Sequence, residues 1–130
     1  MIDHLSLGTA ELARAAAFYD AVLAPLGVVR VWSFPDAVGY GVPGGGDQLA
    51  LKARAGATAP GAGFHLAFTA GSHDAVDAAW RAGVAGGGRD DGPPGLRERY
   101  GPGYYAAFLV DPDGHRLEVV CHDKAASAAS

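Results

Sequence analysis

The segment DHLSLGT, residues 3–9, has a counterpart in FHLAFTA, residues 64–70, with a histidine at the second position of each. Apolar residues alternate with small or polar ones in both segments, which is the pattern of a strand with one buried face. His4 and His65 lie on the face opposite the apolar residues of their strands. A repeat of this kind indicates two structural units of the same type within one chain.

A helix is expected after each of these strands. In the first unit Thr9 is the expected N-cap of a helix whose apolar residues recur at helical spacing, and Gly27 is its expected end. In the second unit Ser72 is the expected N-cap and Gly83 the expected end. Each unit therefore begins with a strand followed by a helix.

The rest of each unit is expected to form a meander of strands. Further strands are predicted at residues 28–34, 37–42, 48–52, 84–88, 104–110 and 115–121. Residues 89–103, rich in Gly and Pro, are predicted to be a long loop, and Asp-Pro-Asp-Gly at 111–114 favours a type I turn. The sequence thus predicts an α+β fold of two βαβββ modules in tandem.

The length of 130 residues suits one domain with a sizeable core, and 49% hydrophobic with 18% charged residues is typical of a globular protein. We expect a single domain at residues 1–123. It comprises module one at 1–53, a linker at 54–62, and module two at 63–123. Residues 124–130 (KAASAAS) are expected to form a flexible tail.

The charge pattern argues against nucleic acid as a partner, because the net charge is -4 and no basic cluster occurs. No apolar run approaches the roughly 20 residues that a membrane span needs. The single cysteine, Cys121, cannot form an intramolecular disulfide, and the N-terminus does not have the pattern of a signal peptide. We therefore expect a cytoplasmic protein without membrane or nucleic-acid partners.

Three stretches resemble the glyoxalase/bleomycin-resistance/dioxygenase (vicinal oxygen chelate) superfamily. They are DHLSLGTAELARAAAFYDAVLAPLG at residues 3–27, FHLAF at 64–68, and FLVDPDGHRLEVV at 108–120, of which the last is the most specific. Together they include both ends of the second module and the start of the first. The resemblance implies a curved mixed sheet in which two modules form a cup, with one divalent metal ion inside it.

The resemblance implies that inward-facing residues of the first and last strand of each module hold the metal. Carried over position by position, these residues are His4, His65 and Glu118. Glyoxalase I has a carboxylate where this sequence has Ala50, which counts against that activity specifically. Two histidines and one carboxylate leave coordination positions open for water and substrate, and suit Mn, Fe, Co, Ni or Zn.

The resemblance also implies a homodimer in which His4 of one chain completes a site with His65 and Glu118 of the other. A site within one chain stays open as an alternative. A single strand histidine is more often structural than a ligand, but the repeated position of His4 and His65 favours ligands. Glu118 either binds the metal or pairs with a neighbour such as Arg116.

Several further residues are weaker candidates for contact with a small-molecule substrate. They are Ser6, Tyr40, Gln48, Arg97, Arg99, Tyr100 and His122. The arginines and Tyr100 belong to the predicted loop, where they could donate hydrogen bonds to an anionic or phenolic substrate or simply form a solvated surface. Of the other histidines, His73 is expected to face solvent and His115 to belong to the turn.

The favoured function is a metal-dependent enzyme that acts on a small oxygenated substrate, with lyase or isomerase chemistry similar to that of lactoylglutathione lyase. No general base can be named. A thiol transferase is an alternative, because DPDGHRLE at 111–118 resembles fosfomycin-resistance transferases. So are a ring-cleaving dioxygenase and a non-catalytic protein that sequesters its ligand, as in the bleomycin-resistance branch.

Overall fold

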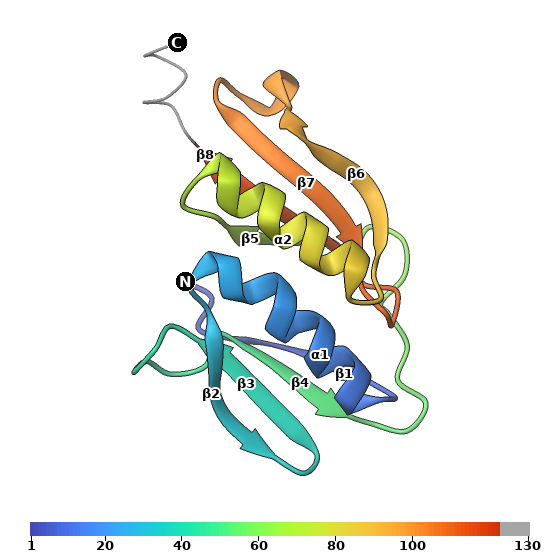
Figure 1. Cartoon of the computed structure of the whole chain (residues 1–130). Helices are drawn as coiled ribbons and strands as arrows, with labels where there is room; N and C mark the ends of the chain where they lie inside the picture. Colours follow the sequence, from blue (N-terminus) through green and yellow to red (C-terminus); the bar gives the residue numbers. More distant parts are fainter. Residues whose placement is uncertain (123–130) are drawn as a thin grey trace.

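The computed structural model describes residues 1–122 of the chain, which form two βαβββ modules (Figure 1). The first module contains, in order, β1 (Leu5–Thr9), α1 (Leu12–Leu23), the 3-10 helix η1 (Ala24–Leu26), β2 (Val29–Phe34), β3 (Ala37–Gly41) and β4 (Leu49–Ala53). The second contains β5 (Leu66–Thr69), α2 (His73–Ala85), β6 (Arg89–Leu96), the 3-10 helix η2 (Glu98–Tyr100), β7 (Tyr104–Val110) and β8 (Arg116–His122). The predicted tail at 124–130 lies outside the described residues.

Each module has one four-stranded mixed sheet with the same topology. The strand orders are β1-β4-β3-β2 and β5-β8-β7-β6. The first strand of each module pairs in parallel with the last, and the other neighbours are antiparallel. The predicted α+β fold of two tandem modules is therefore confirmed. No helix within residues 1–122 has the length and apolar character to cross a membrane.

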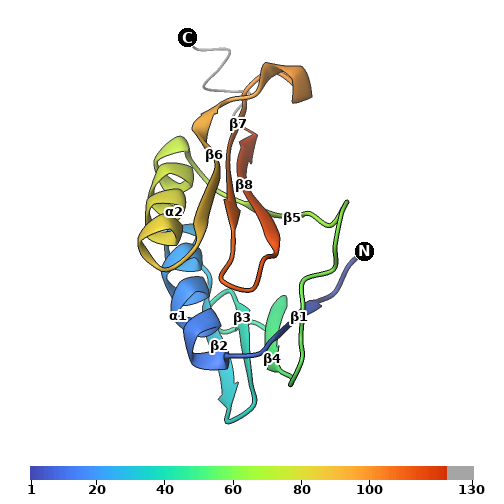
Figure 2. The same ribbon diagram turned by 90° about the vertical axis from the view of Figure 1, so that its right-hand side faces the viewer.

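The two helices lie side by side and cover the same side of the molecule (Figure 2). The buried core lies between this helical layer and the sheets, and its large members include Tyr19 and Leu23 of α1, Val76 of α2, and Leu51 and Leu109 of the sheets. The opposite face of each sheet carries no helix. We call this opposite face the cup face.

Helix α1 begins later than the sequence predicts. Thr9 is not its N-cap; Glu11 occupies that position and makes no side-chain capping bond. The Thr9 hydroxyl instead accepts a hydrogen bond of 3.2 Å from the amide of Glu11, which shapes the turn before the helix. Gly27 ends the helical segment with a left-handed conformation (φ 76°), as predicted.

Helix α2 begins after Ser72, as predicted, but it does not end at Gly83. It continues to Ala85, so the strand predicted at 84–88 is absent. A Cβ atom at Gly83 would lie 2.6 Å from Cδ1 of Leu109. Glycine at this position therefore allows α2 to approach β7 closely and does not end the helix.

The predicted loop at 89–103 is also wrong in its first half, because residues 89–96 form strand β6. Two proline residues and two glycines in this segment are unusual for a strand, but an edge strand tolerates them because one side of its backbone is unpaired. The pairing with β7 shifts around Gly92, whose φ of 150° is accessible mainly to glycine.

The turn at 111–114 forms as predicted, with the amide of Gly114 donating to the carbonyl of Asp111. The Asp111 side chain is buried and accepts four hydrogen bonds. The donors are the Tyr19 hydroxyl, the His115 ring, and the amides of Asp113 and His115. This carboxylate therefore connects α1 of module one to the last turn of module two.

Candidate metal centre

The strand register of module two places Glu118 on the cup face. Glu118 of β8 is paired with Ala67 of β5 on one side and with Phe108 of β7 on the other. Tyr105, three residues before Phe108 on β7, faces α2, where its hydroxyl donates a hydrogen bond to Asp77. Phe108 and Glu118 therefore face away from the helix, since alternate residues of a strand face opposite sides.

His65 and Glu118 come together as the sequence predicts. The Nε2 atom of His65 lies 2.7 Å from Oε1 of Glu118. Glu118 is only 2% exposed, whereas about half (49%) of the His65 side chain is open to solvent. A buried carboxylate thus faces an accessible imidazole at the centre of the second sheet.

Tyr104 is a third member of this group that sequence reasoning missed. Its hydroxyl donates a hydrogen bond to Oε2 of Glu118. Burial together with this hydrogen bond raises the pKa of Tyr104 to about 12, so the hydroxyl keeps its proton near neutral pH. Strand parity could have placed Tyr104 on the face of Phe108, but it gives no sign that the hydroxyl reaches Glu118.

His4 lies apart from this group. Its side chain is exposed, and its Nδ1 atom lies 2.6 Å from a carboxylate oxygen of Asp3, whose hydrogen bond raises the pKa of His4. Within residues 1–122 the nitrogen and oxygen atoms of His4, His65 and Glu118 do not gather within 4.8 Å of one another. One chain alone therefore assembles two of the three predicted ligands.

The two modules nevertheless place their histidines equivalently. Ser6, two residues after His4, is paired with Ala50. Ala67, two residues after His65, is paired with Glu118 in the same way. Ala50 therefore occupies in module one the position that Glu118 occupies in module two, so the first module contributes a histidine without a carboxylate.

The predicted substrate contacts from 97–100 and the end of β8 surround Tyr104 and Phe108. The Tyr104 ring lies 5.2 Å from Tyr100 and 5.0 Å, edge to face, from His122. The Arg99 guanidinium covers the Tyr100 ring at 4.8 Å from its centroid and donates to its hydroxyl. These residues thus form an aromatic rim beside Glu118.

Arg97 contacts the same group through Phe108. Its guanidinium is 5.5 Å from the centroid of Phe108, whose ring is 6.1 Å from that of His65. It donates to the carbonyl of Pro93 and forms no ion pair with an acid in the part of the chain that the structure describes. A cation without a counter-charge is therefore held close to the pair of metal-ligand candidates.

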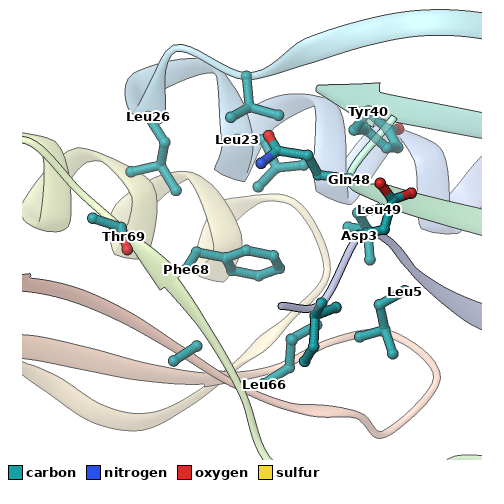
Figure 3. Close-up of a pocket in the computed structure, with 13 residues that line it drawn as sticks. Asp3, Leu5, Leu23, Leu26, Tyr40, Gln48, Leu49, Leu66, Phe68 and Thr69 are labelled. Carbon is teal, nitrogen blue, oxygen red and sulfur yellow. The ribbon is translucent and has the colours of Figure 1, made fainter. Parts of the chain in front are cut away.

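The remaining predicted contacts belong to module one. Ser6 and Gln48 are exposed. Tyr40 lies on the helix side of its sheet, where its buried hydroxyl donates to Asp20 and to the carbonyl of Ala16. Burial raises the pKa of Tyr40, with help from Asp20. Tyr40 therefore lies on the helix side of its sheet and not on the cup face, and it forms part of the wall of the cavity between the modules (Figure 3).

A cavity of about 380 Å³ lies between the two modules (Figure 3). Its wall is mainly apolar, with Leu23 and Leu49 from module one and Phe68 from module two. Asp3 and Gln48 add polar atoms on one side. The volume falls in the range of small-molecule sites.

A second group of possible ligands lies in the turn before β8. Atoms of Asp111, Asp113 and His115 lie within 4.8 Å of one another. Both oxygens of Asp111 are already used, however, and an ion would have to displace the bonds from Tyr19 and His115. Sequence reasoning assigned His115 to the turn without expecting it to be buried, and its 2% exposure reflects this network.

His73 also differs from expectation. It is half-buried rather than solvent-facing, because its ring stacks on Tyr105 with 3.9 Å between centroids and 5° between planes. The stacking lies on the helix side of the second sheet, since Tyr105 faces α2. His73 is therefore remote from the cup face.

Comparison with known proteins gives a consistent result. The sequence profile of the Glyoxalase/Bleomycin resistance protein/Dioxygenase superfamily matches residues 1–119. A glyoxalase/bleomycin resistance protein from Albidiferax ferrireducens T118 is 32% identical, with a TM-score of 0.77 over 91% of this chain and 95% of that one. No curated protein matches the chain.

Two further solved structures share the fold. A putative glyoxalase from Bacillus halodurans is 26% identical, with a TM-score of 0.70, and the match covers 93% of this chain and 95% of that one. A glyoxalase-related enzyme from Fulvimarina pelagi is 23% identical, with a TM-score of 0.72 over 93% and 87% of the two chains. The match therefore includes both modules in each case.

Proposed function

Because this chain belongs to the glyoxalase/bleomycin-resistance/dioxygenase superfamily, we propose that it is a metal-dependent enzyme acting on a small oxygenated substrate, with lyase or isomerase chemistry. The observation that carries the proposal is the contact between His65 and Glu118 on the cup face. A buried carboxylate needs a compensating positive charge, and a divalent ion between these two side chains would supply it.

The geometry of the pair fits this role with a small adjustment. Two donors bound to one ion at about 2.1 Å are about 3.0 to 3.4 Å apart, depending on the coordination angle. His65 and Glu118 stand at 2.7 Å, so an ion requires them to separate by a few tenths of an ångström. The exposed His65 side chain has room for this movement. Nitrogen and oxygen donors suit Mn, Fe, Co, Ni or Zn.

We further propose a homodimer in which His4 of each chain completes the site of the other. A twofold axis brings the same pair of surfaces together twice, so a dimer would contain two equivalent sites. The exposure of His4 and its separation from His65 and Glu118 within the chain support this arrangement.

The bound ion would act as a Lewis acid on a substrate oxygen. The other residues of the cup face would position the substrate. Arg97, fixed by Pro93 and Phe108, carries a charge that no acid of the described chain neutralises, and it would bind an anionic group of the substrate. Tyr100 and His122, which pack against Tyr104, would form an aromatic wall of the site.

The same proposal places the enzyme in the cytoplasm, with no nucleic-acid or membrane partner. The sequence contains a single cysteine, which cannot form an intramolecular disulfide, and this fits a reducing compartment. The net charge of -4 would repel nucleic acid.

A non-catalytic, ligand-sequestering protein is the second candidate. The apolar cavity of about 380 Å³ between the modules favours it, because such a cavity can hold a small ligand without any metal. Stoichiometric ligand binding without turnover would establish this function. A thiol transferase or a dioxygenase would instead show metal-dependent turnover with a thiol or with oxygen.

The experiment is elemental analysis of untagged protein after exposure to each of the five metals, with His65→Ala as the test variant and His73→Ala as the matched control. About one ion per chain is expected in the wild type and in His73→Ala, since each chain provides one pair of His65 and Glu118. The ion should be lost from His65→Ala. Wild-type protein that takes up none of the five metals would refute the proposed enzyme.

A further inference from the structure

We propose that Tyr104 is a positioning residue of the metal site: its hydroxyl holds Glu118 so that a single carboxylate oxygen faces the ion. This inference rests on the proposed metal-binding function. The evidence for the role of Tyr104 is the arrangement of side chains around Glu118. This role predicts that removal of the Tyr104 hydroxyl changes the affinity and coordination of the ion, which metal binding alone does not predict.

The contact between Tyr104 and Glu118 is not a simple consequence of strand pairing. Tyr104 is paired with His122, and Glu118 is paired with Phe108, four residues further along β7. Four residues of an antiparallel strand span about 14 Å. Ala106 lies between Tyr104 and Phe108 on the same face of β7 and is fully buried. Because its side chain is small, the Tyr104 ring can extend over it toward Glu118.

Two neighbouring rings hold Tyr104 in this orientation. His122 meets it edge to face, with 5.0 Å between centroids and 89° between planes. Tyr100 meets it at 5.2 Å and 53°. The ring is therefore restricted from two sides, and its hydroxyl is directed at Glu118 before an ion binds.

The two oxygens of Glu118 consequently have different partners. Oε2 accepts the hydrogen bond from Tyr104, and Oε1 faces His65. Glu118 has no lysine or arginine partner within residues 1–122. A neutral hydroxyl fixes the carboxylate without neutralising it, so the full negative charge stays available to a cation at Oε1.

Removal of the hydroxyl should release this constraint. In Tyr104→Phe, Glu118 can rotate and present both oxygens to the ion, and the buried Oε2 loses its donor. Loss of such a supporting hydrogen bond typically weakens metal affinity by about 10- to 100-fold. A change from one to two carboxylate oxygens should also raise the coordination number of the ion.

Tyr105→Phe is the matched control. It makes the same chemical change at the adjacent residue of β7 and also removes a hydrogen bond from a tyrosine to a carboxylate, 2.6 Å long, to Asp77. That bond lies on the helix side of the sheet. Its loss can affect stability but should leave the metal site unchanged.

The test uses Co²⁺, whose visible absorption reports its coordination number, on the full-length protein. Affinity is measured by competition with a chelator for wild type, Tyr104→Phe, Tyr105→Phe and His122→Ala, with circular dichroism as the check on folding. We expect Tyr104→Phe to bind cobalt about 10- to 100-fold more weakly with a less intense, shifted spectrum. His122→Ala, which keeps the hydroxyl but removes one ring that holds it, should show a smaller change in the same direction.

The outcomes separate the two proposals. Cobalt binding by the wild type with equal affinity and spectrum in Tyr104→Phe and Tyr105→Phe would overturn the positioning role alone. Absence of cobalt binding by the wild type would overturn the metal site, and the role of Tyr104 with it. Weaker binding in both variants would mean a general loss of stability and would also count against a specific role for Tyr104.

Discussion

The hydroxyl of Tyr19 in module one donates a hydrogen bond of 2.5 Å to Asp111 in module two, and both side chains are buried. Burial and the negative charge of Asp111 raise the pKa of Tyr19 well above its usual value, so it remains a donor. The His115 ring donates to the same carboxylate at 2.8 Å. The two modules are thus joined by a buried polar connection as well as by their apolar core.

Tyr19→Phe should destabilise the fold, because it leaves Asp111 without one of its donors. Hydrogen bonds to charged groups contribute about 1.5 to 3 kcal/mol, and we expect a loss of that size in the free energy of unfolding. Urea unfolding followed by circular dichroism measures it. Tyr100→Phe, which removes an exposed hydroxyl, is the control and should change the free energy by less than about 0.5 kcal/mol. Equal effects would contradict the account.

The same network predicts how stability depends on pH. The hydrogen bond that the His115 ring donates to Asp111 raises the pKa of His115 above its ordinary value of 6.5. The stabilisation from charged His115 is therefore complete below pH 6.5 and is lost as the pH rises through the raised pKa. Burial alone would raise the pKa of Asp111, but hydrogen bonds from His115 and Tyr19 lower it below 3.8, so its contribution is lost only in acid.

The measurement is the free energy of unfolding of wild type and His115→Asn at several pH values between the two ordinary pKa values, 3.8 and 6.5, and above them. Within that pH interval we expect the free energy of unfolding of the wild type to exceed that of His115→Asn by the largest amount. The difference should shrink as the pH rises above 6.5. A difference that stays constant into the alkaline range would show that His115 does not carry the charge we assign to it.

Gly83→Ala should also destabilise the protein, although alanine favours helix more than glycine does. The new Cβ atom would lie 2.6 Å from Cδ1 of Leu109 and 3.2 Å from Cγ2 of Val22. Overpacking of this kind costs about 1 to 3 kcal/mol, and a lower midpoint of thermal unfolding would reveal it. Gly71→Ala is the control, because its new Cβ atom would have no neighbour within 4 Å, and it should leave the midpoint unchanged. A higher midpoint in Gly83→Ala would refute the close packing of α2.

The repeat around the two histidines was enough to predict the fold, because strand alternation and helical spacing are local properties of the sequence. The resemblance to the superfamily, rather than this alternation, predicted that His65 and Glu118 lie together, and their side chains are 2.7 Å apart. The alternation could not identify Tyr104 as a partner of Glu118, since that contact depends on a long side chain that extends along the strand over Ala106.

The two incorrect predictions of secondary structure in module two have one physical origin. Glycine and proline were interpreted as breaks, whereas β6 tolerates them at an open sheet edge and Gly83 provides space for helix packing. In each case a contact between distant segments outweighed the local signal.

The most direct test of the central claim, a metal site shared between two chains, combines His4→Ala and His65→Ala. Each variant alone should lack every complete site. In a refolded equimolar mixture, half of the dimers would pair the two variants, and each such dimer would contain one intact site, so the account predicts about one ion per four chains. A mixture that binds no more metal than either variant alone would contradict it.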